Sequence, residues 1–262
     1  MMNRAKYKKG VTLLELSTVL ILIGLIITGV LISQNVMEAS KIHNIIAEVQ
    51  AHQRNFNLFR ERYRGKPGDF IRAREIFGTG TYSGNGDGVL CTDEAGQFWQ
   101  HMYMAGYIEE AMTGISTAVD CATPNWALSN GVRTYPSKAM KGNFNSTTGI
   151  AYFGNTQDPY YYNNTTFGRT KINLSLARFR ASLYSTNVGD TIFTPKFMSK
   201  IDAKADDSYP HTGNIRGARG NNNSATSCAT NESWTGTFPV GDVLYQISDL
   251  DAECLAVFTI ED

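Results

Sequence analysis

The chain has 262 residues and carries 24 basic and 24 acidic side chains, so its formal net charge is zero. A neutral chain lacks the positive field that attracts nucleic acid, and we therefore predict no nucleic-acid partner. All four cysteines follow residue 90, with neither a CxxC motif nor a zinc-type Cys/His spacing, and this favours two disulfides over a metal site.

The first predicted element is an apolar helix over residues 11–32, which contains one charged residue, Glu15. A helix of this length rises about 33 Å, enough to cross a bilayer. The segment before it has no acidic residue and several basic ones, namely Arg4, Lys6, Lys8 and Lys9. Because basic flanks stay on the cytoplasmic side, we expect a single-pass protein with a cytoplasmic N-terminus and its later residues outside.

Glu15 is the unusual feature of this helix. A carboxylate at the centre of a bilayer costs about 2.5–3.5 kcal/mol, so its presence asks for a functional reason. A cleaved secretory signal is one alternative, but the apolar core of such signals has about 7–15 residues and this stretch is longer. A plain signal anchor explains the length of the stretch and leaves Glu15 unexplained.

The junction Lys8-Lys9-Gly10-Val11, with Glu15 at the fifth position after Gly10, resembles the processing site of type IV pilins and type II secretion pseudopilins. In that family a membrane peptidase cuts after the glycine and methylates the new amine. The resemblance thus implies cleavage after Gly10 and N-methylation at Val11, where the family usually has Phe or Met. It also implies an inner-membrane location with a periplasmic C-terminal domain, and an extracytoplasmic filament after assembly.

The resemblance gives Glu15 a role in assembly, in which its carboxylate attracts the N-terminal amine of a neighbouring subunit. A helix bundle has a low dielectric, so it strengthens this attraction and penalises a register that leaves either charge unpaired. A second interpretation needs no partner, because a carboxylate near the start of a helix also complements the dipole of its own helix.

The helix is predicted to continue well beyond residue 32. Apolar residues recur at spacings of three, four and seven on an otherwise polar helix: Ile42, Ile45, Ile46, Val49, Phe56, Phe59 and Tyr63. His52 falls on this stripe, which favours a packed histidine over a ligand or a catalytic base. Gly65-Lys66-Pro67-Gly68 should end the helix, because the residue before a proline avoids the helical region.

The remaining residues, 65–262, are predicted to form one globular domain. Helices are expected at 71–77, at 93–108 and after the N-cap pair Thr194-Pro195. Strands are expected at 150–153, 160–162, 243–247 and 254–260, with a strand passing into a helical turn over 172–184 and a surface loop over 217–227. The predicted class is α+β, pilin-like: a leader at 1–10, then a helix over 11–64 that packs on an antiparallel sheet.

Three further motifs are similar to those of bacterial pilin-like proteins with an N-terminal methylation segment. They are Tyr63-Arg64-Gly65-Lys66-Pro67-Gly68-Asp69; Gly84-Asn85-Gly86-Asp87-Gly88 ahead of Trp99-Gln100-His101-Met102; and Ile201-Asp202-Ala203-Lys204-Ala205-Asp206-Asp207 with Thr212-Gly213. They support one pilin-like domain and identify no substrate.

Four cysteines allow three pairings. Proximity in sequence favours the pairing of Cys91 with Cys121 and of Cys228 with Cys254. The resemblance implies the same, since members of the family close a C-terminal loop with a disulfide. We predict no resident cofactor, with calcium as the alternative to tight turns at three acidic clusters. These clusters are Asn85-Gly86-Asp87 with Asp93 and Glu94; Asp202 with Asp206 and Asp207; and Asp242 with Asp249 and Asp251.

No motif of nucleophilic, metal-hydrolytic or phosphate-binding catalysis occurs, so we predict that the chain is not an enzyme. The resemblance implies a structural subunit of a type IV pilus or a type II secretion pseudopilus, and the large soluble part favours a minor subunit. Its implied partners are the prepilin peptidase, other subunits through the N-terminal helix and an inner-membrane assembly platform. The alternative is a monomeric, signal-anchored domain that binds a ligand outside the membrane.

Overall fold

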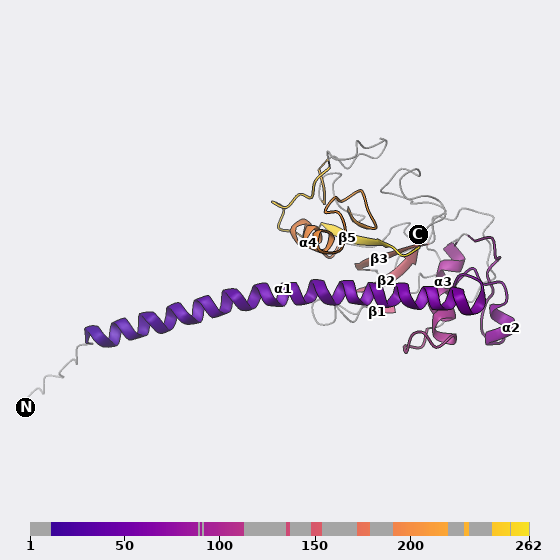
Figure 1. Ribbon diagram of the computed structural model, residues 1–262, viewed down its shortest axis with the longest axis horizontal. Helices are drawn as coiled ribbons and strands as arrows, with labels where there is room; N and C mark the ends of the chain where they lie inside the picture. The colour runs from indigo at the N-terminus through magenta and orange to yellow at the C-terminus, as the bar shows by residue number, and fades with distance from the viewer. Residues whose placement is uncertain are drawn as a thin grey trace, which may run out of the picture. The chain divides into compact units, whose positions relative to one another are not determined.

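The computed structural model describes residues 12–88, 90, 92–112, 135–136, 148–153, 172–178, 191–219, 228–230, 243–251 and 253–261. The helices are α1 (Leu13–Tyr63), α2 (Ala73–Phe77), α3 (Thr92–Met104) and α4 (Pro195–Ala205) (Figure 1). The strands are β1 (Tyr135–Pro136), β2 (Thr148–Phe153), β3 (Asn173–Arg178), β4 (Ile215–Arg219) and β5 (Cys254–Thr259). The layout is α+β, as predicted, and the chain divides into two compact units, Met1–His43 and Asn44–Asp262.

The part of α1 in the first unit exposes its large apolar side chains from Leu13 to Ile32. Leu13 is 87 % exposed and Leu25 is 66 % exposed. Soluble proteins rarely leave an apolar surface of this extent uncovered. By length and composition α1 can cross a membrane, a test that a signal sequence near the N-terminus also passes.

In the second unit α1 buries the predicted stripe, including Ile45, Phe56 and Phe59. Phe56 stacks on Phe98 of α3 with ring centroids 6.3 Å apart. His52 is buried, and its ring lies edge-on to the ring of Trp99 in α3, with centroids 5.2 Å apart. The prediction that His52 is a packed histidine is confirmed. The aromatic face of α1 therefore packs on α3.

Both helix ends near this core use left-handed residues. Arg64 follows α1 with φ of 55° and ends it one residue before the predicted Gly65. α3 stops at Met104 instead of the predicted 108, because Gly106 adopts φ of 78° and the amide of Tyr107 bonds back to the carbonyl of Met102. That pair of features is a Schellman motif, which closes a helix at a glycine.

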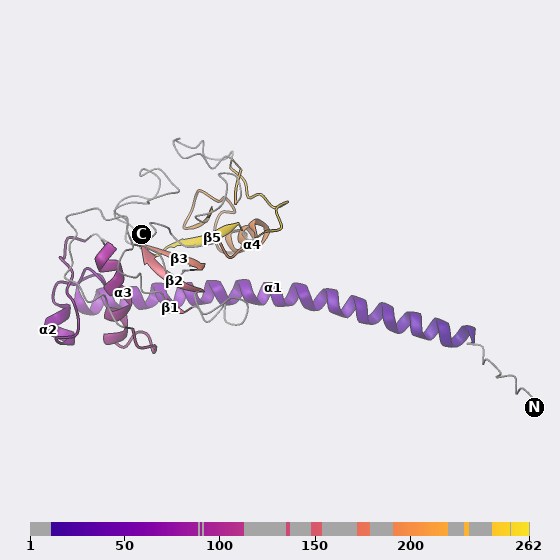
Figure 2. The same cartoon turned by 180° about the vertical axis from the view of Figure 1, so that it is seen from behind.

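The strands form one sheet in the order β1-β2-β3-β5-β4, and every neighbouring pair is antiparallel. α4 lies against β4 and β5 (Figures 1 and 2). Its start is the predicted one: the hydroxyl of Thr194 accepts the amide of Phe197 at 3.2 Å, and Pro195 occupies the first helical position. Met198 and Ile201 are buried on its inner face.

Two predictions about the last third of the chain are wrong. The first three residues of the predicted loop at 217–227 belong to β4, and residues 220–227 lie outside the described residues. A Cβ on Gly217 would collide with the ring of Tyr245, so packing over a glycine and not strand propensity sets this strand. The predicted strand at 243–247 is reduced to one isolated bridge between Tyr245 and Ala229. The predicted strand at 160–162 and the second half of 172–184 lie outside the described residues.

Candidate functional site

Glu15 closes the first turn of α1. Its Oε2 accepts the backbone amide of Thr12 at 2.9 Å and the Thr12 hydroxyl at 3.0 Å. In return, the Thr12 hydroxyl accepts the amide of Glu15 at 3.2 Å. This reciprocal pair is a capping box, which the T-x-x-E signature of the sequence could have predicted.

The environment of Glu15 is otherwise apolar and open. Leu14 is 72 % exposed and Leu16 58 % exposed, so the carboxylate sits on an uncovered apolar surface. In the described part of the chain Glu15 makes no ion pair. Gly10 and Val11, the predicted processing residues, lie outside the described residues.

A second polar site lies in the globular unit, and we call it the motif junction: residues 66–69, 82–88, Glu94 and His101. Asp69 joins two of the motifs, since its Oδ1 accepts the amide of Gly86 at 2.6 Å and its Oδ2 that of Gly88 at 2.9 Å. Burial raises the pKa of the Asp69 carboxyl, although both hydrogen bonds favour its charged form.

His101 joins the same motifs from α3. Its Nδ1 accepts the amide of Gly68 at 2.8 Å, and its Nε2 lies 2.8 Å from the carbonyl of Tyr82. The ring therefore carries its proton on Nε2. Burial lowers the pKa of His101 to about 4, so the ring is neutral at pH 7. Both ring nitrogens are thus engaged by the backbone.

Lys66 and Glu94 complete the junction. Lys66 Nζ donates to the carbonyl of Gly88 at 2.6 Å and lies 2.9 Å from Glu261 Oε2. The other carboxylate oxygen, Glu261 Oε1, pairs with Arg60 at 3.4 Å. Glu94 Oε1 accepts the amide of Asn85 at 2.8 Å. These contacts tie the end of α1, the glycine-rich turn and the C-terminal residues together.

The glycines of these motifs are required by close packing. Gly68 has φ of 90°, and a Cβ there would lie 2.6 Å from the carbonyl oxygen of Glu94. A Cβ on Gly84 would collide with the backbone of Asp69. The first two of the three sequence motifs therefore pack together in one structure.

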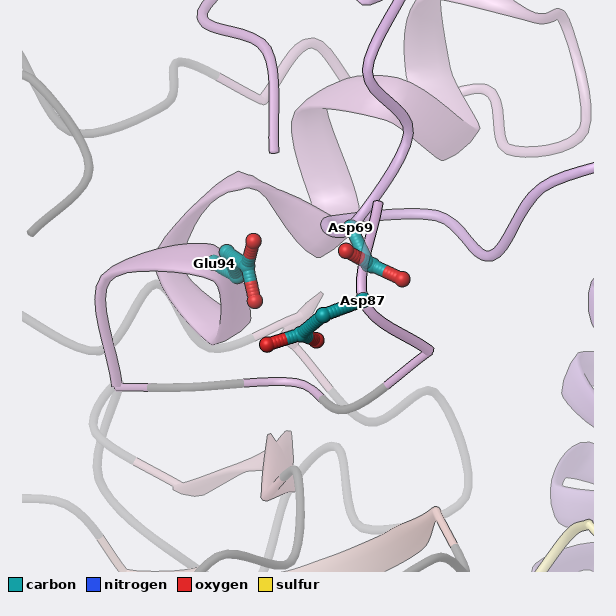
Figure 3. A group of neighbouring side chains, drawn as sticks. All are labelled: Asp69, Asp87 and Glu94. Carbon is teal, nitrogen blue, oxygen red and sulfur yellow. The ribbon is translucent and has the colours of Figure 1, made fainter. Parts of the chain in front are cut away.

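Asp69, Asp87 and Glu94 bring carboxylate oxygens within 4.8 Å of one another, and the three side chains converge in Figure 3. Calcium takes six to eight oxygen ligands, so three carboxylates form part of such a site. Both oxygens of Asp69 and one of Glu94 accept backbone amides. This arrangement suits the expected tight turn, held by carboxylates, and calcium stays the alternative.

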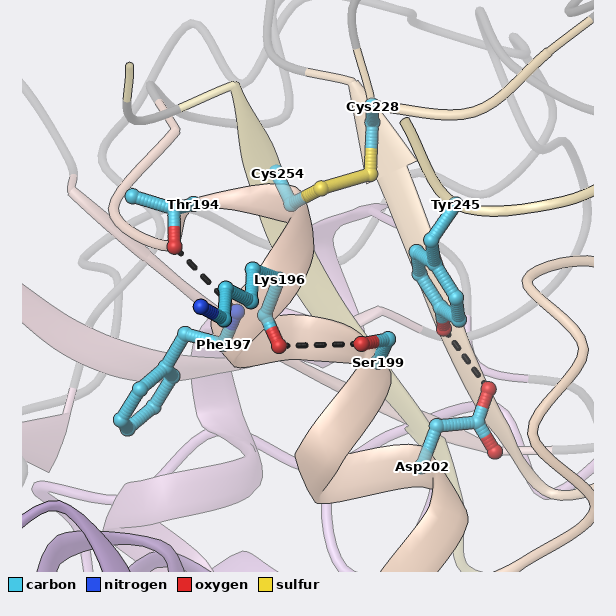
Figure 4. Close-up of a disulfide and its surroundings, with 8 residues drawn as sticks. All are labelled: Thr194, Lys196, Phe197, Ser199, Asp202, Cys228, Tyr245 and Cys254. Carbon is cyan, nitrogen blue, oxygen red and sulfur yellow. Dashed lines mark hydrogen bonds between the residues drawn. A yellow bond between two sulfur atoms is a disulfide. The ribbon is translucent and has the colours of Figure 1, made fainter. Parts of the chain in front are cut away.

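A second acidic cluster joins α4 to the loop before β4. Asp202 accepts the Tyr245 hydroxyl at 2.7 Å (Figure 4) and the amide of Ser208 at 3.0 Å. Burial raises the pKa of the Asp202 carboxyl to about 7. Asp206 accepts the amide of Ile215 at 2.7 Å. A Cβ on Gly213 would collide with Asp206, which explains the glycine at this position.

The third predicted calcium cluster is described only in part. Asp242 lies outside the described residues. Asp249 accepts the amide of Asp251, as in a tight turn.

Cys228 and Cys254 form the predicted disulfide, with Cα atoms 5.0 Å apart and a sequence separation of 26 (Figure 4). The bond attaches residues 228–230 to the start of β5. The other predicted pair, Cys91 with Cys121, lies outside the described residues.

Comparison of the chain with known protein families, curated proteins and solved structures finds no match. The three polar sites differ in what they bond to. The motif junction and the Asp202 cluster bond mainly to backbone groups within the globular unit, whereas Glu15 bonds only inside its own helical turn.

Proposed function

We propose that this chain is a prepilin-like structural subunit. It is cleaved after Gly10, N-methylated at Val11 and assembled into a type IV pilus or a type II secretion pseudopilus, as a minor subunit. The observation that carries the proposal is Glu15, the one charged residue of an exposed apolar helix segment that would span a membrane.

The apolar half of α1 is suited to contact other helices of the same kind. Its side chains face outward on all sides, so copies can bundle through this surface once they leave the lipid. Within such a bundle Glu15 attracts the amine of a neighbouring Val11, because a low dielectric strengthens the attraction between opposite charges. A register that leaves this carboxylate unpaired is penalised.

The capping box gives Glu15 hydrogen-bond partners in the single subunit. The amide and hydroxyl of Thr12 both donate to Oε2, and this reduces the cost of a carboxylate in an apolar setting. The monomer can therefore be stable in the membrane before it is assembled.

The disulfide supports an extracytoplasmic place for the globular unit. Structural disulfides persist in oxidising compartments such as the periplasm and are rare in the cytosol. With the basic leader inside, the helix spans the inner membrane once. Its partners are the prepilin peptidase, an inner-membrane assembly platform and other subunits, and the chain builds rather than catalyses.

Mass spectrometry of the mature N-terminus of the full chain tests the processing step. Cleavage should leave a methylated Val11, and Gly10→Val should block it by placing a larger side chain before the scissile bond. An intact leader on the wild-type chain would favour the signal-anchored binding domain instead. A mature start near residue 40 would indicate ordinary secretion.

The assembly step is tested by Glu15→Ala. We expect normal membrane insertion and a much smaller share of the chain in sheared filaments. The matched control is Glu61→Ala, which removes an exposed carboxylate from the other end of α1. Equal incorporation of both variants would contradict the role of Glu15.

A further inference from the structure

One short segment near the C-terminus exposes three large apolar side chains. Leu244 is 56 % exposed, Ile247 60 % and Leu250 83 %. We call this segment, residues 243–251, the C-terminal patch. Asp249 and Asp251 lie in the same segment, so the patch is both apolar and acidic.

The C-terminal patch is firmly attached to the fold. Val243 and Tyr245 are buried, and the Tyr245 hydroxyl donates to Asp202 at 2.7 Å. The carbonyl of Leu244 accepts the amide of Thr230 at 2.8 Å, next to the disulfide of Cys228. The apolar side chains are thus presented to solvent by a fixed backbone.

A second exposed apolar surface has the opposite charge. It lies over residues 71–76, at the start of α2, and we call it the α2 patch. Ile71 is 61 % exposed and Ile76 43 % exposed. Arg72 forms an ion pair with Glu75 at 2.9 Å, whereas Arg74 makes no ion pair in the described part of the chain. The α2 patch therefore has a net charge of one positive unit, on Arg74.

The two patches belong to the same globular unit and lie apart in it. α2 follows the C-terminal end of α1, and the C-terminal patch lies on the far side of α4, at the other end of the unit (Figures 1 and 2). They do not meet within one chain. A contact between one patch and the other therefore needs two copies, and such a heterologous contact can repeat without closing.

We propose that the C-terminal patch of one copy docks on the α2 patch of the next copy of this chain. Leu250 and Ile247 cover Ile71 and Ile76, and Asp251 pairs with Arg74. The occupant is argued from complementarity: an apolar surface with negative charge meets an apolar surface with positive charge. The inference rests on the proposed filament function and names its contact outside the membrane helix.

Charge reversal in the full chain tests this contact. Arg74→Glu and Asp251→Arg should each reduce the amount of sheared filament at least about fivefold, because each places like charges in contact. The double variant restores opposite charges and should return to within about twofold of wild type. Lys204→Glu reverses an exposed charge on α4 outside both patches and should have no effect.

Cross-linking tests the contact directly. Chains carrying Leu250→Cys and chains carrying Ile76→Cys are expressed together, and a disulfide-linked dimer should form only when both are present. Normal filaments from both single charge reversals, without this dimer, would overturn the docking and leave the filament function intact. A wild-type chain with an intact leader and no filaments would overturn both proposals.

Discussion

Glu15 and Asp69 are both carboxylates that accept backbone amides, but they hold different parts of the chain. The donors to Glu15 belong to Thr12, three residues away in the same helical turn, and the carboxylate is exposed. The donors to Asp69 belong to Gly86 and Gly88, 17 and 19 residues away, and the carboxylate is buried. Only the second carboxylate connects segments that are distant in sequence.

This difference separates stability from assembly. Removing a link between distant segments should lower the free energy of unfolding of the globular unit, whereas removing the local link of Glu15 should leave it unchanged. A polar group that contributes little to its own fold is free to serve a partner. The following variants test that separation in the full chain in detergent micelles.

The disulfide is the strongest long-range link, and its loss should have the largest effect. Replacing Cys228 and Cys254 together by Ala should lower the free energy of unfolding by about 3–4 kcal/mol, because the open chain regains the entropy of a 26-residue loop. Denaturant unfolding followed by tryptophan fluorescence measures the change. A loss below about 1 kcal/mol would mean that the noncovalent contacts of Tyr245 already fix this segment.

Asp69→Ala should cost about 3 kcal/mol, because it leaves the amides of Gly86 and Gly88 without their acceptor in a buried turn. Asp87→Ala is the matched control, since Asp87 is exposed in the same turn and should cost less than about 1 kcal/mol. Equal losses in the same unfolding experiment would show that the turn is held by other contacts.

Calcium sharpens the same comparison. If Asp69, Asp87 and Glu94 only hold the turn, then millimolar calcium or EDTA should leave the melting temperature of the wild-type chain unchanged. A calcium-dependent rise in wild type that disappears in Asp69→Ala would make this cluster a metal site, because a ligand stabilises the state that binds it.

Much of the fold was predictable, since its signals are local. The stripe from Ile45 to Phe59 follows from helical spacing, and Thr194-Pro195 announces the start of α4 within two residues. β4 gave no such local signal. Its Gly217 leaves space for the ring of Tyr245, and that residue is distant in the sequence.

The candidate site divides in the same way. The Thr12–Glu15 capping box is a local pattern and could have been predicted. The pairing of Asp69 with Gly86, or of His101 with Gly68, depends on how distant segments fold together. The sequence motifs gave no sign that these two segments lie side by side.

His101 gives the long-range links a pH dependence. Its pKa falls from 6.5 to about 4 on folding, so the unfolded chain binds the proton more readily between these values. The contribution of His101 to the free energy of unfolding is fully present above pH 6.5. On acidification from pH 6.5 to about 4 it is lost, by about 1.4 kcal/mol per pH unit. His211, with its pKa lowered to about 4, acts in the same direction, whereas Asp202, raised to about 7, acts in the opposite one.

His101→Gln isolates this contribution, because His211 and Asp202 are unchanged in the variant. Between pH 6.5 and 4.5 its free energy of unfolding should depend on pH less steeply than that of wild type, by about 1.4 kcal/mol per unit. The two unfolding curves are compared at each pH. Parallel profiles would show that His101 titrates normally in the folded chain.

Thr12→Val should have the smallest effect and tests the local side of the comparison. It removes the hydroxyl that accepts the amide of Glu15. The free energy needed to open the first turn of α1 should therefore fall by about 1 kcal/mol. Hydrogen exchange of that amide should accelerate about fivefold, while amides near Phe56 and the free energy of unfolding stay unchanged. Thr12→Ser keeps the hydroxyl and should behave as wild type. If Thr12→Val instead destabilised the globular unit, the two regions would be coupled through α1, and the loss of assembly in Glu15→Ala could no longer be attributed to a partner alone.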